Sequence, residues 1–163
     1  LYDEKCLDIT RFNIKRDIEE VELYKSLHEK KTKIGICRGG QFLNVMNGGK
    51  MYQDVNNHRG SHVIYTPKGE HLGEVTSTHH QMMVPAATGI VMAVAERTTK
   101  RTRAGGTVVA SFDDDTEVVK YESTQSLCFQ PHPEYNHVNT EKLFWQGLGL
   151  MQNKELKSFL GVK

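Results

Sequence analysis

The sequence predicts an α/β protein in which helices pack against a central sheet. Helical patterns lie near both ends of the chain, over 17–30 and 139–150, and short β-branched or alternating apolar segments occupy the interval between them. The length of 163 residues is sufficient for one domain with its own core. We find no internal repeat, low-complexity segment or linker, so we expect 1–163 to form a single domain.

The N-terminal part of the chain predicts a helix followed by a strand. Apolar side chains recur at helical spacing within 17–30, and we expect them to face the core: Ile18, Val21, either Leu23 or Tyr24, and Leu27. The short β-branched segment 32–36 is typical of a buried strand.

A second helix is expected directly after this strand, over 38–47. Phe42, Val45 and Met46 are expected on its inner face. The pair Gly48–Gly49 marks its end, because glycine readily adopts the left-handed backbone conformation found after helix C-termini.

The remainder of the chain predicts several strands and a closing helix. Glycine and proline recur through 58–74, which indicates loops and short strands. Further strands are expected at 89–96, 107–112, 117–122 and 126–130, with an acidic turn at 113–115. The closing helix, 139–150, is expected to direct Leu143, Phe144, Gly147 and Leu148 inward.

Cys37 lies at the junction between the first expected strand and the helix that follows it. Gly35 and Gly39 flank it two residues away on either side, where a side chain would collide with a tight turn. This pattern is typical of a nucleophile elbow, which holds a reactive side chain exposed on a strained strand-to-helix turn. The alternative for a free cysteine is a buried structural residue, and we favour that interpretation for Cys6 and Cys128.

The later segment Gln-Pro-His-Pro-Glu supplies the partners that a cysteine nucleophile needs. His132 can accept the thiol proton, and Glu134 can orient the histidine. A neighbouring histidine and a helix N-terminus both stabilise a thiolate, so we expect a reactive thiolate at Cys37. These residues predict a catalytic triad of Cys37, His132 and Glu134.

These two segments resemble the signature of the class I glutamine amidotransferases, a Gly-x-Cys-x-Gly elbow followed late in the chain by His-Pro-Glu. The segments 48–54 and 76–81 are similar to those of the branch that includes γ-glutamyl-γ-aminobutyrate hydrolases, the peptidase C26 group. The resemblance runs from residue 1 to about residue 149 and implies a sandwich fold. In this family a mixed, mainly parallel sheet carries helices on both faces.

The resemblance also implies roles in substrate binding. The backbone N–H of Arg38 would donate to the oxyanion, Gln41 would contact the amino-acid end of the substrate, and the backbone of Ser77, Thr78 and His79 would bind its carboxylate. The family's second oxyanion donor comes from a glycine-rich loop on an earlier strand. Neither that loop nor the family's first strands have a counterpart in this sequence, which we expect to be N-terminally incomplete relative to the family.

Several of these residues have simpler interpretations. Gln41 would then be an ordinary glutamine on a helix surface, and His79 and His80 a polar pair in a loop. The side chain of Arg38 would either attract a substrate carboxylate or lie on the surface.

The eight histidines raise the alternative of a metal site. His132, Glu134 and His137 form a His-x-Glu-x-x-His pattern, to which His79 and His80 could add ligands. This spacing is not that of a zinc-binding helix, and the prolines on either side of His132 oppose a helix there. We therefore expect neither a metal nor an organic cofactor.

Charge and hydropathy exclude several other classes of protein. A net charge of +1 gives no overall electrostatic attraction to nucleic acid or to an acidic membrane. No apolar run approaches the ~20 residues of a membrane span, and no signal peptide is recognisable. Three cysteines without regular spacing do not predict a disulfide framework, so we expect a reducing, cytoplasmic setting.

Three functions fit these observations. We expect cysteine-dependent hydrolysis of a γ-glutamyl amide, foremost glutamine, through a thioester, with the ammonia passing to a partner synthetase or transferase. The second is a stand-alone hydrolase of γ-glutamyl amines or peptides. The third is a non-catalytic scaffold or regulatory relative, which the intact Cys37, His132 and Glu134 argue against.

Overall fold

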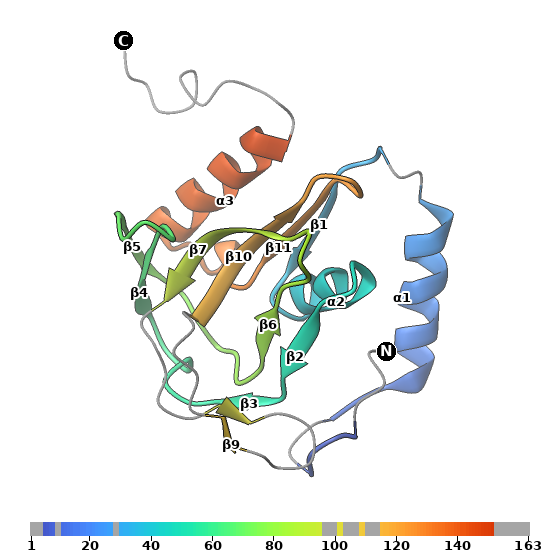
Figure 1. Cartoon of the computed structure of the whole chain (residues 1–163). Coiled ribbons are helices and arrows are strands. Elements are labelled where there is room, and N and C mark those ends of the chain that lie inside the picture. The colour runs from blue at the N-terminus through green and yellow to red at the C-terminus, as the bar shows by residue number, and fades with distance from the viewer. Residues whose placement is uncertain are drawn as a thin grey trace.

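The computed structural model describes residues 5–8, 11–27, 30–95, 101–102, 108–109 and 115–151. At its centre lies a six-stranded sheet with the strand order β1-β11-β10-β7-β4-β5 (Figure 1). Its strands are β1 (Lys33–Ile36), β4 (His62–Tyr65), β5 (His71–Val75), β7 (Ile90–Ala95), β10 (Asp115–Tyr121) and β11 (Ser126–Phe129).

Two smaller sheets and the helices complete the described fold. The strand β2 (Lys50–Tyr52) pairs with β6 (Met82–Val84), while β8 (Arg101–Thr102) lies between β3 (Asp54–Val55) and β9 (Val108–Val109). The helices are α1 (Ile14–Ser26), α2 (Arg38–Met46) and α3 (Val138–Met151), with a 3-10 turn, η2, at Pro133–Tyr135. None of these helices has the length and apolar character to cross a membrane.

The predicted α/β class is confirmed, but the balance of strand pairing differs from the mainly parallel sheet that the resemblance implied. Among the described strands of the large sheet, β1 and β11 pair in parallel. The pairings β11–β10, β10–β7, β7–β4 and β4–β5 are antiparallel. Short turns join β4 to β5 and β10 to β11, and such short connections can link only antiparallel neighbours.

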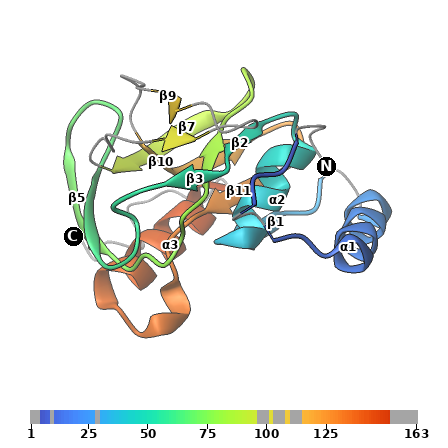
Figure 2. The same cartoon turned by 90° about the horizontal axis from the view of Figure 1, so that it is seen from below.

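The large sheet carries a core on each face, because alternate residues of a strand point to opposite sides. Leu127 and Phe129 of β11 belong to a core against which Phe144 of α3 packs. Cys128, between them, belongs to a second core that includes Leu43 of α2. The helices α2 and α3 therefore cover opposite faces of the sheet, as Figures 1 and 2 show.

The helix α1 differs from its prediction, because none of its residues is fully buried. Ile18, expected to face the core, is 53% exposed, and Leu23 is 61% exposed. Tyr24 contacts the rest of the protein edge-to-face against Phe42 of α2. Both cartoon views show α1 set apart from the sheet, with α2 between them (Figures 1 and 2).

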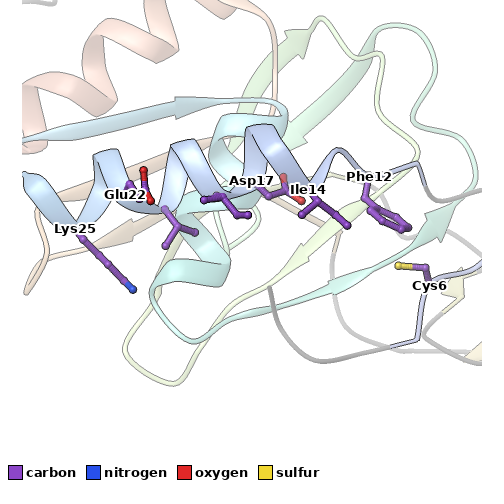
Figure 3. Close-up of a pocket in the computed structure, with 8 residues that line it drawn as sticks. Cys6, Phe12, Ile14, Asp17, Glu22 and Lys25 are labelled. Carbon is purple, nitrogen blue, oxygen red and sulfur yellow. The ribbon is translucent and has the colours of Figure 1, made fainter.

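An apolar pocket follows the outer side of α1. Figure 3 shows Phe12 and Ile14 at the N-terminal end of the helix, with Cys6 nearby and Lys25 at the far end of the pocket. Phe12 and Ile14 are each 63% exposed, so the amphipathic pattern of this segment forms a surface and not a core contact.

The inner face of α2 also differs from the prediction. Leu43 and Asn44 are the buried residues in the second half of this helix, whereas Phe42 and Val45 are only partly buried against the core. Asn44 is fully buried because its amide donates to the backbone oxygen of Lys50 and its oxygen accepts from the Tyr121 hydroxyl. The periodicity missed this position because it counts apolar side chains only.

The predicted strands around 32–36, 89–96, 117–122 and 126–130 and the closing helix are present, with ends shifted by one or two residues. Leu143 and Phe144 pack inward as predicted, and Gly147 is buried. Of the strand predicted at 107–112, only 108–109 lies within the described residues, and 113–114 of the predicted acidic turn also lies outside them. Asp115 is not in a turn: it begins β10 and is fully buried.

Candidate active site

Cys37 occupies the turn between β1 and α2 in an unusual backbone conformation. Its φ is 48° and its ψ is −111°. A positive φ is uncommon for any residue with a side chain, and such strain is found preferentially at functional sites. The backbone N–H of Cys37 donates to the carbonyl oxygen of Phe129 at 2.8 Å. This bond extends the parallel pairing of β1 and β11 and holds the cysteine beside the end of β11.

The glycines around the elbow are not equivalent. A Cβ atom on Gly35 would overlap the carbonyl group of Gly39, so only glycine fits there. A Cβ atom on Gly40 would lie 3.0 Å from both the Gly35 oxygen and the Phe129 nitrogen, whereas one on Gly39 would meet nothing within 4 Å. The prediction that Gly35 and Gly39 both relieve collisions is right for Gly35 and wrong for Gly39; Gly40 has that role instead.

His132 and Glu134 follow β11 and contact each other directly. The Nδ1 atom of His132 lies 2.7 Å from Oε1 of Glu134. Since an ionised carboxylate only accepts hydrogen bonds, Nδ1 carries the proton and Nε2 is free to accept. The hydroxyl of Thr78 lies 2.9 Å from that Nε2 atom and donates to it. Burial opposes ionisation of Glu134, but the hydrogen bond from His132 holds the pKa of its carboxyl below the usual 4.5.

Two further residues, both missed by the sequence analysis, fix the position of His132. The hydroxyl of Thr76 accepts from the backbone N–H of His132 at 3.1 Å and donates to its carbonyl oxygen at 2.9 Å. The ring of Tyr135 stacks on the imidazole with 4.6 Å between centroids and 6° between planes. Thr76 lies in the segment that carried the resemblance, but only the fold, which brings the segment after β5 to the segment after β11, reveals its contact.

The surroundings of Cys37 hold its thiol in the neutral form. Burial raises the pKa of the thiol, and the negative charges of Glu134 and Glu117 raise it further. The backbone N–H of Arg38 and the side-chain amide of Gln130 act in the opposite direction. The net direction is upward, which differs from the thiolate that the sequence predicted. The helix N-terminus is present as expected, but its effect is outweighed.

Gln41 is buried and is not an ordinary surface residue. Its Nε2 atom lies 3.1 Å from Oε1 of Gln130 and 3.2 Å from the carbonyl oxygen of Gln81. Gln130 was not predicted as a site residue, yet its side chain connects Gln41 to the thiol of Cys37. The Nε2 atom of Gln130 is buried without a hydrogen-bond acceptor, so it is available to a charge that forms on the sulfur.

The side chain of Arg38 is engaged with α1. Its guanidinium forms ion pairs with Asp17 and Glu20. The backbone N–H of the same residue acts on the thiol of Cys37, and its role as an oxyanion donor stays a prediction. Arg38 therefore joins the elbow to α1, and neither of the two simple interpretations of its side chain describes it.

The segment predicted to bind the substrate carboxylate splits between the site and the interior. Thr78 is exposed and reaches His132, as described above. The hydroxyl of Ser77 donates to the backbone oxygen of His58, and both residues are buried. His79 is 3% exposed and directs its ring inward, where Nδ1 lies 2.9 Å from the Gln81 oxygen. His79 is thus not part of a solvated polar loop, and its ring contacts the same Gln81 oxygen as the side chain of Gln41.

The structure also places the possible metal ligands and the two other cysteines named in the sequence analysis. The pattern His132, Glu134, His137 does not converge, because Nδ1 of His137 lies 2.9 Å from the hydroxyl of Thr140 while His132 pairs with Glu134. Cys128 is a core residue as predicted, and burial raises the pKa of its thiol to about 12. Cys6, predicted to be buried, is exposed.

In a second group of ionisable residues, His79 alone was a candidate in the sequence analysis. His58, His62, His79 and Glu117 meet inside the protein beside Asp115, and we call these five residues the histidine–carboxylate cluster. Burial lowers the pKa of His58, but hydrogen bonds to Asp115 and Glu117 raise it to about 9. No local motif marks this cluster, because its members come from separate segments of the chain.

The fold and the arrangement around Cys37 define the class of protein. An α/β sandwich with a cysteine at a strand-to-helix elbow, and with a His–Glu pair after the neighbouring strand, agrees with the resemblance of the sequence to the glutamine amidotransferases. The model of the peptidase C26 family matches residues 1–134. The chain belongs to this family.

Solved structures agree with this assignment at the level of the fold. A Thermoplasma acidophilum protein described as part of a GMP synthase is 16% identical, with a TM-score of 0.53 over 84% of this chain and 68% of that one. A glutamine amidotransferase of Thermotoga maritima is also 16% identical, with a TM-score of 0.50 over 90% of this chain and 66% of that one. The chain therefore spans about two thirds of the length of these proteins. A comparison with curated protein sequences gave no match.

Proposed function

We propose that the protein hydrolyses a γ-glutamyl amide through a thioester on Cys37. The observation that carries this proposal is the strained elbow, which holds the thiol beside the end of β11, three residues before the His132–Glu134 pair begins. A buried structural cysteine needs neither a positive φ nor a glycine at position 35.

In the proposed reaction, Sγ of Cys37 attacks the side-chain carbonyl carbon while its proton passes to Nε2 of His132. Glu134 stabilises the resulting imidazolium through the bond to Nδ1. The carbonyl oxygen becomes an oxyanion that accepts from the Arg38 backbone N–H. The C–N bond then breaks, His132 returns its proton to the departing ammonia or amine, and the thioester remains.

Hydrolysis of the thioester completes the cycle. His132 removes a proton from water, the hydroxide oxygen bonds to the acyl carbon, and the C–S bond breaks. The carboxylate product leaves, and Sγ of Cys37 regains the proton from His132. Because the surroundings of Cys37 favour the neutral thiol, deprotonation accompanies attack instead of preceding it. Before it can accept a proton from sulfur, Nε2 of His132 must release the hydrogen bond from Thr78.

Two variants of this function differ in the fate of the nitrogen. Glutamine hydrolysis that supplies ammonia to a separate synthetase or transferase is supported by the fold shared with the protein described as part of a GMP synthase. A stand-alone hydrolase of γ-glutamyl amines or peptides is supported by membership of the peptidase C26 family. We place glutamine hydrolysis first, since the amide of glutamine is the smallest substrate with the required γ-glutamyl group.

The test is ammonia release from L-glutamine, compared between the unaltered protein, Cys37→Ser and Cys6→Ala. Cys6 is a matched control because it is a free thiol on the surface. We expect Cys37→Ser to abolish release, since a serine hydroxyl is far less acidic than a thiol, and Cys6→Ala to leave release unchanged. Equal release by Cys37→Ser and the unaltered protein would overturn the proposal.

Amine release from γ-glutamyl anilides distinguishes a glutaminase from a stand-alone γ-glutamyl hydrolase. A stand-alone hydrolase should act on the bulkier amides faster than on glutamine, without any partner. A third measurement detects a reactive Cys37 even when turnover is too slow to follow. A diazoketone analogue of glutamine should alkylate Cys37 and not Cys6, as seen by peptide mass spectrometry. A protein that releases neither product and is not labelled at Cys37 would be the non-catalytic relative.

A further inference from the structure

The histidine–carboxylate cluster has polar atoms that the protein itself does not satisfy. Glu117 is fully buried, and neither of its carboxylate oxygens makes a hydrogen bond. Nδ1 of His58, Nε2 of His62 and Nε2 of His79 each lie 3.3 Å from the same oxygen, Oε1 of Glu117. These three nitrogens are also buried without a hydrogen bond. Unsatisfied buried groups are rare in folded proteins, and each one signals a missing ion, water or function.

The proton positions sharpen this conflict. Nε2 of His58 lies 2.8 Å from Oδ2 of Asp115, a group that accepts hydrogen bonds, so the proton of neutral His58 belongs on Nε2. Its Nδ1 atom then directs a lone pair toward Glu117. His79 has the same arrangement, because its Nδ1 atom donates to the carbonyl oxygen of Gln81. A lone pair facing a carboxylate oxygen is repulsive, so either a cation lies between the two atoms or the imidazole is protonated on this nitrogen as well.

This arrangement is the one found around metal-bound histidines. A ligating imidazole almost always donates its other N–H to a carboxylate or a backbone carbonyl, which fixes the ring orientation. Asp115 provides that contact for His58. Because Asp115 and His58 are both almost completely buried, this contact is held away from water.

The spacing of the ligand atoms favours one coordination geometry. The ligand atoms of His58, His62 and Glu117 all lie within 4.8 Å of one another. Ligands at about 2.0–2.1 Å from a tetrahedral zinc ion are separated by about 3.3–3.4 Å. The separations of His58 and His62 from Glu117 are both 3.3 Å. Two imidazoles and a carboxylate are also a known zinc ligand set that leaves a fourth position open.

We propose that His58, His62 and Glu117 bind a divalent transition-metal ion of the zinc class, with Asp115 as a positioning residue. The site joins β4 and β10 to the loop after β3, so the ion would hold these segments together. The backbone oxygen of Glu117 also accepts from the N–H of Gln130 at 2.9 Å, which connects the site to the end of β11. The role assigned to the ion is structural, and the amide hydrolysis proposed above does not depend on it.

The charges of the cluster support a cation over an uncharged ligand. Glu117 is fully buried, and its two carboxylate oxygens make no hydrogen bond. Burying an unpaired carboxylate costs several kcal/mol, on the order of that for any isolated ion in a protein interior. A divalent cation would offset the negative charge of Glu117 while the histidines remain neutral ligands. The competing solution is protonation of the histidines, and the experiment separates the two.

The experiment uses Co²⁺ as a spectroscopic substitute for zinc, added to protein that has been stripped of metal with a chelator and dialysed. A background with both Cys37→Ala and Cys6→Ala removes the two cysteines that are not fully buried, whose thiolates would add a sulfur-to-cobalt absorption in the ultraviolet. We expect one equivalent of Co²⁺ to give the intense visible bands of a tetrahedral complex, and Zn²⁺ to displace it. Absence of these bands in folded protein would overturn the proposal and leave protonated histidines as the solution.

Matched variants locate the site. His62→Ala removes a proposed ligand whose two ring nitrogens make no hydrogen bond, so the fold should tolerate it. We expect it to weaken binding by more than about 100-fold, and Asp115→Asn to weaken it by about 10- to 100-fold. His71→Ala is the control, because His71 is exposed on β5 outside the cluster. Unchanged binding in His62→Ala, or equal loss in His71→Ala, would show that the metal binds elsewhere.

Substitution of His79 tests the boundary of the ligand set. His79 contacts the same oxygen of Glu117 but is not one of the three residues whose ligand atoms converge. His79→Gln is therefore expected to weaken binding less than His62→Ala does. A larger loss in His79→Gln would contradict the assignment of His62 as the third ligand.

Discussion

The protein contains two groups in which histidine meets glutamate, and they differ in nearly every physical respect. In the pair His132–Glu134 the carboxylate side chain is 52% exposed, and both ring nitrogens of the histidine have hydrogen-bond partners. In the histidine–carboxylate cluster, Glu117 is fully buried and its oxygens lack hydrogen bonds. The same residue types thus form a partly exposed, hydrogen-bonded pair in one place and a buried cluster with unsatisfied polar atoms in the other. Burial and hydrogen bonding, more than residue identity, distinguish the two groups.

The largest expected difference between the two groups is in stability. Glu117→Gln removes the charge on which three histidines converge, and breaking such a buried arrangement costs about 3–5 kcal/mol. Glu134→Gln breaks a largely exposed pair and should cost less than about 1 kcal/mol. Urea denaturation of both variants measures this difference. An equal loss of stability in Glu117→Gln and Glu134→Gln would contradict the view that burial makes the two glutamates differ.

The second prediction concerns the elbow that holds Cys37 near the exposed pair. Gly35→Ala places a methyl group on the Gly39 carbonyl, and overpacking of this kind costs about 1–3 kcal/mol when the backbone shifts to relieve it. Gly39→Ala is the matched control, because nothing lies within 4 Å of the new atom and alanine favours a helix by up to about 1 kcal/mol over glycine. The melting temperature and the rate of ammonia release should both fall in Gly35→Ala. Both should be retained in Gly39→Ala. Loss of activity in both would show that the elbow needs more space than its backbone indicates.

The third prediction compares two threonines beside His132. Thr76→Val leaves the backbone N–H and C=O of His132 without a partner, at a cost of about 1–2 kcal/mol. Thr78→Val removes one exposed hydroxyl and should change stability by less than about 0.5 kcal/mol. Urea denaturation measures both values. A larger loss in Thr78→Val would mean that the imidazole, and not its backbone, anchors this segment.

The smallest effect is expected in the reactivity of Cys37. Its raised pKa means that the thiolate fraction at neutral pH is below that of an ordinary cysteine, so alkylation by iodoacetamide should accelerate as pH rises past 9.0. Glu134→Gln removes a negative charge that raises this pKa, so it should speed alkylation near neutral pH while it slows turnover. Mass spectrometry of the Cys37 peptide gives the rates.

The rate of alkylation in His132→Ala completes this test. A neutral resting thiol predicts little change on loss of the imidazole, whereas a thiolate–imidazolium pair predicts a marked decrease near neutral pH. A marked decrease would return the assignment to the thiolate that the sequence predicted.

The sequence predicted what depends on neighbouring residues. The elbow around Cys37 and the pair His132–Glu134 are each specified within a few positions, so their spacing alone identified them. The class of fold followed from apolar periodicity, which reports local structure directly. The membership of the chain in the peptidase C26 family agrees with both.

What the sequence did not predict depends on tertiary contacts. Residues 58, 62 and 117 come together only when β4, β7 and β10 pair, and no spacing rule connects them. Asp115 was predicted in an acidic turn, because its contact with His58 inside the protein is not visible in the sequence. The exposed apolar face of α1 shows the opposite error: its periodicity is helical, but periodicity does not show what covers a helix.

The hydrogen bond between the Cys37 N–H and the Phe129 carbonyl has a consequence for how this protein can change. It fixes the register of the elbow against β11, so the position of His132 relative to the sulfur depends on the number of residues after Phe129. One inserted or deleted residue there would move the imidazole by up to about 3.3 Å along the chain. Insertions and deletions should therefore be tolerated in the exposed turn between β4 and β5 but not between 129 and 132. A relative whose sequence has a gap in that interval would keep the fold and lose the alignment of nucleophile and base.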